Sequence, residues 1–338
     1  MGNDKQRELV YLTLPRIGLV ARPAVQPPDC SLNQKKTRLP CLPLPTLCFQ
    51  HGVCELTTAR RALVLAGGGF AASAWEIGLI SGIAAAGVDL RTSDLFVGTS
   101  SGARVALHLA SGTDPEDLFH QQLGPMPRTA GSHPIVDWRT IRAEWARAKD
   151  AGGGLAAILQ RVGTLALGIA GTKEGDRRQE VAAQLPSQTW PTKRLLVVAV
   201  NAETGERRVF DSSCGVDLVD AVVATTAFFG WAPARINGQP YIDGGFYSTD
   251  NADLASGLDQ VVVLTLRPLV PSSCLVSLDE AVDILRAAGT QVKVIHPDEK
   301  CLVAFASVGS TMNPEVRGPA AKAGRAQGQR LVEERSLS

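Results

Sequence analysis

The chain has 338 residues, of which 45% are hydrophobic and 20% are charged, and this balance supports a globular core. A formal net charge of +1 provides no field that would attract nucleic acid, so we expect no nucleic-acid partner. The sequence contains neither a long uncharged apolar run for a transmembrane helix nor the pattern of a signal peptide at its N-terminus. These exclusions favour a cytoplasmic protein.

Residues 1–58 differ in composition from everything that follows. Segments such as Arg22–Pro28 and Leu39–Pro45 are rich in proline and show neither a helical nor a strand period. We therefore expect residues 1–58 to form a poorly ordered extension and residues 59–335 to form the folded domain. Four of the 7 cysteines lie in this extension, and an odd total without close C-x-x-C pairs favours reduced thiols over disulfides or a zinc site.

From residue 59 onward, short apolar runs alternate with longer amphipathic ones. The strands that this pattern predicts are Ala62–Ala66, Leu95–Val97, Leu195–Val200, Gln260–Leu266 and Val292–Ile295. The predicted helices are Ala74–Ala86, Gly102–Ala110, Trp138–Lys149, Val216–Ala224, Leu278–Ala288 and Ala320–Glu333. Such alternation predicts an α/β fold with a central, mostly parallel sheet flanked by helices on both faces.

A tight turn is expected at Asn237-Gly238, because this dipeptide favours the backbone conformation of two-residue β-hairpin turns. The residues on either side predict a hairpin whose second strand leads to Asp243-Gly244-Gly245. Asp-Gly alone is typical of an ordinary turn, so Asp243 gains interest only from the other motifs in the chain.

The segment Gly98-Thr99-Ser100-Ser101-Gly102 has the form G-x-S-x-G and lies between a predicted strand and a predicted helix. A nucleophile elbow needs this context, because its sharp turn lifts the serine out of the sheet. Side chains flanking so sharp a turn would collide, which accounts for glycine at both ends. Ser100 is therefore the candidate nucleophile, at a helix N-terminus that favours developing negative charge. An ordinary Gly-Ser turn is the alternative.

Another strand-to-helix turn carries Gly67-Gly68-Gly69, whose backbone amides can converge on one point and hold an oxyanion. The same segment fits a dinucleotide-binding fingerprint, in which Asp89 would bind the ribose. Asp89 precedes the second strand, however, whereas a ribose-binding carboxylate should follow it. We favour the oxyanion hole, and a nucleotide-dependent enzyme or a plain turn are the alternatives.

A serine hydroxyl is a poor nucleophile and needs a base within hydrogen-bonding reach. Asp243 can accept the proton directly and form a dyad with Ser100. The order Ser100, Asp243, His296 also matches the triad of the α/β-hydrolases, and His296 follows a predicted strand. An aspartate with an ordinary pKa of about 3.9 is a weak base, so a dyad would depend on positioning and on the oxyanion hole.

Together these motifs resemble the patatin-like phospholipases, and most closely their bacterial, actinobacterial-type members. The resemblance covers most of residues 59–335 and rests on the glycine loop with Trp75-Glu76-Ile77-Gly78, the serine elbow and the aspartate motif. It implies a three-layer patatin-like fold, no cofactor or metal, and hydrolysis of phospholipid or other acyl-ester lipids through an acyl-enzyme. On this basis Ser100 is the nucleophile, Asp243 is the base and His296 is structural. The amides implied as oxyanion donors are those of Gly67, Gly68 and Gly69.

The sequence departs from the family's pattern beside both motifs. The glycine loop of the family usually continues to a further glycine and often carries Arg, Lys or a hydroxyl residue just before it, whereas this chain has Ala71 and Ala72. Alanine lacks the backbone freedom of glycine. Ser101 stands where alanine is more frequent. A catalytically weak member that binds lipid is therefore an alternative to an efficient hydrolase.

Apolar residues recur at near-helical spacing between Leu155 and Ile169. Such a helix can pack in the core or face lipid as a lid, and core packing is the more common arrangement. A peripheral contact with a membrane is compatible with the sequence. The lipid that is cleaved and the oligomeric state are not predicted.

Overall fold

The computed structural model describes residues 59–125, 138–169, 174–266 and 275–334. The chain divides into two units, Met1–Glu55 and Leu56–Ser338, and every described residue belongs to the second. The expected extension over residues 1–58 lies outside the described residues, and its predicted disorder stays a prediction.

The described residues form one eight-stranded mixed sheet with the strand order β5-β6-β3-β2-β1-β7-β8, in which β4 pairs with β3 off this path. The strands are β1 Arg61–Leu65, β2 Leu95–Thr99, β3 Arg194–Asn201, β4 Arg207–Phe210, β5 Ala234–Ile236, β6 Gln239–Asp243, β7 Gln260–Leu264 and β8 Gln291–Ile295. Strands β1, β2, β3, β7 and β8 are parallel, whereas β4 and β6 run antiparallel to β3. The predicted α/β fold with a mostly parallel central sheet is confirmed.

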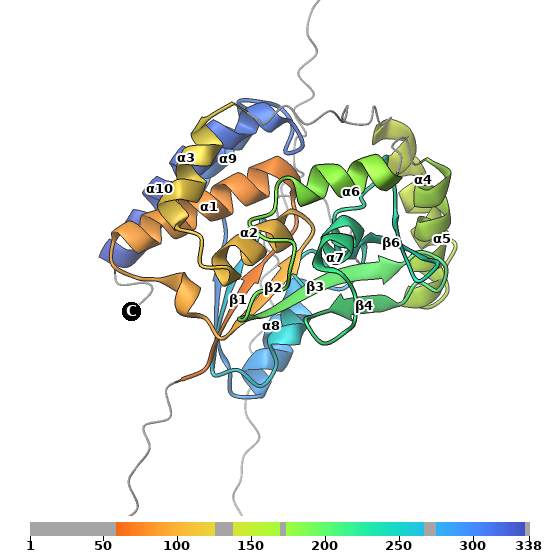
Figure 1. Ribbon diagram of the computed structural model, residues 1–338, viewed down its shortest axis with the longest axis horizontal. Coiled ribbons are helices and arrows are strands. Elements are labelled where there is room, and N and C mark those ends of the chain that lie inside the picture. Colours follow the sequence, from red (N-terminus) through yellow and green to blue (C-terminus); the bar gives the residue numbers. More distant parts are fainter. Residues whose placement is uncertain (1–58, 126–137, 170–173, 267–274, 335–338) are drawn as a thin grey trace, which may run out of the picture. The chain divides into compact units, whose positions relative to one another are not determined.

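Helices cover both faces of this sheet (Figure 1). They are α1 Gly69–Ala85, α2 Ser101–Ala110, α3 Pro115–Leu123, α4 Trp138–Asp150, α5 Leu155–Gly168, α6 Glu174–Ala182, α7 Leu218–Thr225, α8 Leu278–Ala287, α9 Glu299–Ala306 and α10 Arg317–Glu333. Four short 3-10 helices are also present in this part of the chain, namely η1 Leu90–Thr92, η2 Gly244–Phe246, η3 Ala252–Ala255 and η4 Pro314–Val316.

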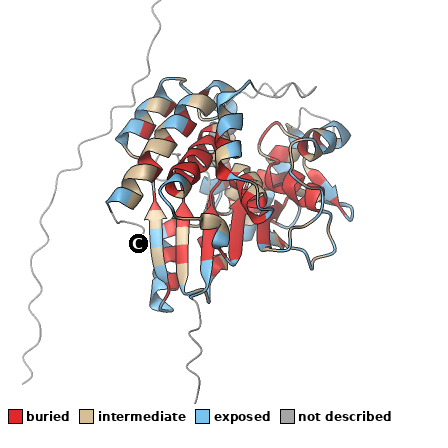
Figure 2. Cartoon of the chain, turned by 60° about the vertical axis from the view of Figure 1, so that its left-hand side comes forward, coloured by how far each residue is buried: buried red, intermediate tan, exposed pale blue. Residues whose placement is uncertain are grey.

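Strand β1 shows how the two faces are built. Leu63 and Leu65 are fully buried in one core cluster, with α1, α2, α7 and α10. Ala62 and Val64 point the other way, into a second cluster that α8 covers. Successive side chains of a strand point to opposite faces, so a strand that is covered on both sides reads as one continuous apolar run. Figure 2 shows the buried residues concentrated along the central strands.

Helix α1 is held against α10 at backbone contact, and Figure 1 shows the two side by side. A Cβ on Gly78 would lie 2.0 Å from the carbonyl oxygen of Ala321, and one on Gly328 would lie 2.2 Å from that of Leu79. Glycine therefore allows an approach that no larger residue permits. This packing fixes α1, which carries the glycine loop at its N-terminus.

All the predicted strands and helices are present, with ends shifted by a few residues. Helix α1 begins at Gly69 rather than at Ala74, because the residues between them, Phe70–Ser73, contain no helix breaker and two alanines. Four short elements of no more than 9 residues were not predicted from the sequence, namely α3, α6, α9 and β4. The predicted hairpin is confirmed, and Asn237 and Gly238 have positive φ angles of 51° and 80°.

Candidate active site

Ser100 lies at the sharp turn between β2 and α2. Its backbone has φ 53° and ψ −126°, outside the regions that residues with a side chain usually occupy. A Cβ on Gly98 would lie 2.4 Å from Ala103 Cα, and one on Gly102 would lie 2.3 Å from the carbonyl oxygen of Leu65. Both flanking positions therefore require glycine, as the elbow hypothesis expected, and the turn holds the Ser100 hydroxyl above the N-terminus of α2.

Asp243 is brought to Ser100 by the hairpin. Strand β6 runs antiparallel to β3 and places Asp243 opposite Ala199, while Thr99 at the end of β2 pairs with Val198 of the same strand. Although 143 residues separate the two in sequence, the Ser100 hydroxyl donates a hydrogen bond to Asp243 Oδ2 at 2.6 Å. A hydroxyl in direct contact with a carboxylate has the arrangement that proton transfer needs.

The Asp243 carboxyl is only 2% exposed, and this burial raises its pKa to about 7. The Ser100 hydroxyl and the Gly245 amide, which donates to Oδ1 at 2.7 Å, lower the pKa but offset only part of this effect. The ordinary aspartate pKa expected from the sequence is wrong here, because burial removes water from the carboxyl. A carboxyl with a pKa near neutrality is a stronger base than an exposed one and is still half ionised at neutral pH.

Gly244 has a packing role beside this carboxyl. A Cβ at this position would lie 2.3 Å from the carbonyl oxygen of Val198. The chain after Asp243 therefore lies directly on β3, which keeps the carboxyl at the end of its strand.

The glycine loop lies against Ser100, since a Cβ on Gly67 would be 2.9 Å from Ser100 Cβ and 3.6 Å from its hydroxyl oxygen. The Gly67 amide already donates to the carbonyl oxygen of Thr249 at 2.8 Å. The amides of Gly68 and Gly69 have no acceptor among the described residues, as is usual at a helix N-terminus. Gly69 has φ 69°, a conformation that favours glycine. Two of the three predicted oxyanion donors are thus free to bind an anion.

Ala71 and Ala72 lie in the first turn of α1, and neither has a positive φ angle. Both are buried, at 0% and 1% exposed. Alanine is the most favourable residue in a helix, so these positions need none of the freedom that glycine offers. The departure from the family's pattern therefore does not distort the loop itself.

Threonine and asparagine side chains that the sequence analysis did not single out for such a role support the elbow. The Ser100 amide donates to Thr225 Oγ1 at 2.8 Å, from the C-terminus of α7. The Asn251 side-chain amide donates to Thr99 Oγ1 at 2.9 Å. Asn251 itself has φ 51°, a left-handed conformation that asparagine tolerates better than most residues. These contacts link segments more than 100 residues apart, so no local sequence signal could have revealed them.

A second buried carboxyl lies on α1 just beyond the glycine loop. Glu76 is 0% exposed, and neither of its carboxyl oxygens has a hydrogen-bond partner within the described ranges. Burial raises the pKa of Glu76 well above its usual value, and the nearby Ala66 amide, itself bonded to the Leu264 carbonyl oxygen at 3.1 Å, offsets little of this. Burial therefore favours the neutral carboxylic acid over the carboxylate at this position.

His296, the candidate third member of a triad, is not brought to Ser100. It is exposed and follows β8, three strands from β2 in the sheet, a separation of about 14 Å at the usual strand spacing. Its carbonyl oxygen accepts a hydrogen bond from Gln327 Nε2 at 2.7 Å.

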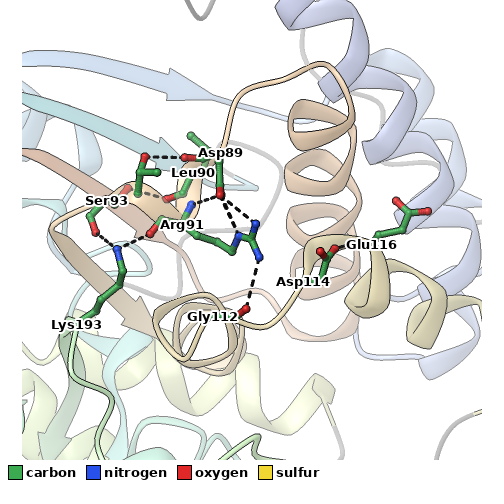
Figure 3. Close-up of polar contacts among 9 residues, drawn as sticks. Asp89, Leu90, Arg91, Ser93, Gly112, Asp114, Glu116 and Lys193 are labelled. Carbon is green, nitrogen blue, oxygen red and sulfur yellow. Dashed lines mark hydrogen bonds and ion pairs between the residues drawn. The ribbon is translucent and has the colours of Figure 1, made fainter.

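Asp89, the ribose-binding candidate, lies before β2 and therefore at the opposite edge of the sheet from Ser100. Figure 3 shows its carboxylate facing the Arg91 guanidinium, with Nε of Arg91 3.0 Å from Oδ1. This aspartate caps η1 by accepting from the Arg91 amide at 2.9 Å. Nothing in this placement supports the dinucleotide-binding alternative.

The helix expected between Leu155 and Ile169 is α5, and its apolar face packs in the core. Leu159 and Val162 are fully buried in a cluster with β3 and β6. A Cβ on Gly163 would lie 2.1 Å from the carbonyl oxygen of Ala202, so α5 is in close contact with the chain beyond β3. The structure therefore supports core packing and not a lipid-facing lid.

None of the described helices is long and apolar enough to cross a membrane. Within the same ranges, no three histidine, cysteine or acidic side chains are grouped closely enough to hold a metal ion.

Comparison with known proteins identifies a family for this chain. A protein-family search matches residues 63–256, which include Ser100 and Asp243, to the family described as "Patatin-like phospholipase". A search of curated proteins found no match to this chain.

Among solved structures, VipD from Legionella pneumophila is similar over 82% of this chain and 67% of its own, with 15% identity and a TM-score of 0.40. ExoU from Pseudomonas aeruginosa, solved in complex with SpcU, is similar over 83% of this chain with 16% identity and a TM-score of 0.37. The chain spans about half the length of that ExoU chain, 53%.

The comparisons give no support to the narrower resemblance to actinobacterial-type members. The family match covers more than half of the chain and contains the elbow, the glycine loop and the aspartate motif. The chain belongs to the patatin-like phospholipase family.

Proposed function

We propose that this protein is a lipid acyl hydrolase that cleaves carboxylic esters through a Ser100–Asp243 dyad. Family membership implies the lipid acyl hydrolase, and the observation that carries the dyad is the 2.6 Å hydrogen bond between the Ser100 hydroxyl and Asp243 Oδ2. The dyad needs no histidine, and His296, the candidate third member of a triad, follows β8, three strands from β2 in the sheet. The substrate class is phospholipid or another acyl-ester lipid.

In this mechanism Asp243 removes the hydroxyl proton as Ser100 Oγ attacks the ester carbonyl carbon. The amides of Gly68 and Gly69 hold the negative charge on the former carbonyl oxygen, and each such donor contributes about 3 kcal/mol. When the tetrahedral intermediate collapses, Asp243 gives its proton to the leaving alcohol, and the acyl group stays on Ser100. Asp243 then deprotonates a water molecule, which attacks the acyl-enzyme, and collapse releases the fatty acid while Ser100 regains a proton.

The environment of Asp243 suits both halves of this cycle. A group that accepts a proton in one step and returns it in the next works best when its pKa lies near the working pH. Burial places the pKa of Asp243 at about 7, and the Gly245 amide holds the other carboxyl oxygen in a fixed orientation. The dyad can therefore exchange a proton with substrate without a third residue.

Hydrolysis of a series of p-nitrophenyl acyl esters by wild type and Ser100→Ala tests this proposal. We expect turnover by wild type, a chain-length profile that reports the acyl preference, and loss of turnover in Ser100→Ala. A stoichiometric burst of p-nitrophenol before the steady state would identify the acyl-enzyme. Equal rates in both proteins would exclude Ser100 as the nucleophile. A folded wild type without activity on any ester would favour the alternative of a lipid-binding member without efficient turnover.

A further inference from the structure

Residues 301–314 contain no charged side chain, although most of them lie at the surface. They include most of α9 and the loop that leads to η4, and only Cys301 and Phe305 among these 14 residues are buried. About a quarter of the residues in globular proteins are charged, and they concentrate at the surface. An uncharged surface segment of this length is therefore unusual, and we call residues 301–314 the α9 strip.

The α9 strip borders the candidate active site. The carbonyl oxygen of Thr311 accepts a hydrogen bond from the Ala71 amide at 3.1 Å, in the first turn of α1. The Met312 sulfur packs against Gly69, where a Cβ would lie 2.3 Å from it. The strip follows β8, whose carboxyl end lies at the same edge of the sheet as that of β2. Its surface is therefore continuous with the glycine loop.

Large exposed apolar side chains gather around this strip. Among the described residues there are four such side chains, and two of them, Val303 at 67% and Met312 at 36% exposed, belong to it. Leu123, at 40%, ends α3 beside the start of α10. The fourth, Ile284 at 59%, lies on α8, which covers the opposite face of the sheet.

The contact that places Leu123 beside the strip comes from Arg317, the first residue of α10. Its Nε donates to Gln122 Oε1 at 3.0 Å, and its Nη2 donates to the carbonyl oxygen of Gln121. Arg317 follows the strip by three residues, so the end of α3 lies next to the end of the strip.

Three polar side chains of the strip, those of Ser307, Ser310 and Asn313, have hydrogen-bond partners within or directly beside it. The Ser307 hydroxyl donates to the carbonyl oxygen of Ala304 at 2.7 Å. Ser310 Oγ accepts from the Met312 amide at 3.2 Å, and Asn313 Oδ1 accepts from the Glu315 amide at 3.0 Å. Removing water from a polar group costs less free energy when the group already has a hydrogen-bond partner. The strip can thus enter an apolar environment at small cost.

We propose that the α9 strip, together with Leu123, is the surface by which this protein sits on an aggregated lipid. This inference rests on the proposed function. When a long acyl chain leaves a lipid aggregate through water, each methylene that it exposes to water costs free energy. A hydrolase whose uncharged rim touches the lipid surface lets the acyl chain reach Ser100 without that exposure. Because the strip carries no charge, its partner is a neutral or zwitterionic surface, and binding does not depend on salt.

Flotation with phosphatidylcholine vesicles, at low and at high salt, tests this proposal in the full chain. The test protein carries Val303→Lys and Leu123→Lys together, and the matched control is Ile284→Lys, at a similarly exposed site on the opposite face. We expect wild type and control to float equally at both salt concentrations, and the double variant to bind about tenfold more weakly, because an ammonium group resists desolvation. Val303→Trp, which enlarges the apolar surface, should float at least as well as wild type.

Hydrolysis of the short, soluble ester p-nitrophenyl butyrate separates this inference from the proposed function. The double variant should keep the wild-type rate on this ester and lose about tenfold on vesicle substrate. Lack of soluble activity in wild type would contradict the proposed function, whereas flotation would still test the strip. The proposed lipid-binding surface is wrong if wild type does not float with the vesicles or if high salt releases the protein from them. It is also wrong if Ile284→Lys binds the vesicles as weakly as the double variant. A change of oligomeric state without a change in flotation would assign the strip to contact between two copies, which also overturns the proposal.

Discussion

Asp243 and Glu76 are both buried carboxyl groups, at 2% and 0% exposed, but they differ in what surrounds them. Asp243 accepts hydrogen bonds from the Ser100 hydroxyl and the Gly245 amide, and its pKa is about 7. Glu76 has no hydrogen-bond partner among the described residues, and its pKa is raised well above the usual value. Desolvation raises the pKa of both groups, and the two donors at Asp243 oppose it. Hydrogen bonds to the carboxylate favour its ionised form, and Glu76 lacks such support.

Replacing each carboxyl by the neutral amide of the same size should give the largest difference in kcat between the two positions. Asp243→Asn removes the base, and we expect kcat to fall about a thousandfold, within the range for loss of a general base. Glu76→Gln keeps the size of a side chain that does not contact the dyad, so kcat should stay within about threefold of wild type. Steady-state rates on a soluble ester measure both. A rate for Asp243→Asn equal to that of Glu76→Gln would exclude Asp243 as the base.

The pH dependence of kcat/KM should report the pKa of Asp243 in the free enzyme. The ionised form is the base, so the rate should rise with pH, with a midpoint at about 7. Below that midpoint we expect a tenfold loss per pH unit, or about a hundredfold loss near pH 5 relative to the plateau. Glu76→Gln should leave the midpoint in place. A midpoint near the ordinary aspartate pKa would show that burial does not control this group.

Glu76 should affect the pH dependence of the free energy of unfolding and not the rate of catalysis. Its folded-state pKa lies above the unfolded value, so its contribution to stability is fully present below the ordinary glutamate pKa and is lost as the pH rises towards the folded pKa. Glu76→Gln removes this dependence. The difference in free energy of unfolding between Glu76→Gln and wild type should therefore shift in favour of the variant from acidic to alkaline pH, by about 1 to 3 kcal/mol. Urea unfolding at several pH values measures it, and a constant difference would mean that Glu76 ionises freely.

The smallest effect is expected at His296. Since this exposed residue lies about 14 Å from the elbow, His296→Ala should change kcat/KM on a soluble ester by less than about twofold. The pH profile should also keep its single midpoint. A large loss of kcat/KM in a folded His296→Ala variant would favour the Ser100–Asp243–His296 triad. It would contradict the proposal that Asp243 is a sufficient base by itself.

Much of this architecture could be predicted from sequence, because the relevant signals are local. Each of these signals constrains only its immediate neighbours. They are the glycines around Ser100, the Asn237-Gly238 turn and the apolar runs of β1 and β3. Short helices such as α9 were missed because their 8 or 9 residues make only about two turns, too few for a helical period to stand out.

What sequence could not supply are the quantities that depend on packing between distant segments. The pKa of Asp243 depends on burial, and the loss of Gly67 as a free donor depends on Thr249, which lies 182 residues further along the chain. The support of Ser100 by Thr225 spans 125 residues. Motifs thus pointed to the candidate reacting groups, whereas their strength as acid, base or donor depends on the tertiary structure.

The placement of β7 and α10 has a consequence for fragments of this protein. Residues 63–256 match the family, yet β7 pairs with β1 over all five of its residues and α10 covers the glycines of α1. A fragment cut at residue 256 would leave β1 as an open, apolar edge in the middle of what had been a sheet, and such an edge invites aggregation. The segment that matches the family is therefore shorter than the smallest unit that can fold by itself. A design that moves the elbow and the glycine loop into another protein must also include β7 and α10.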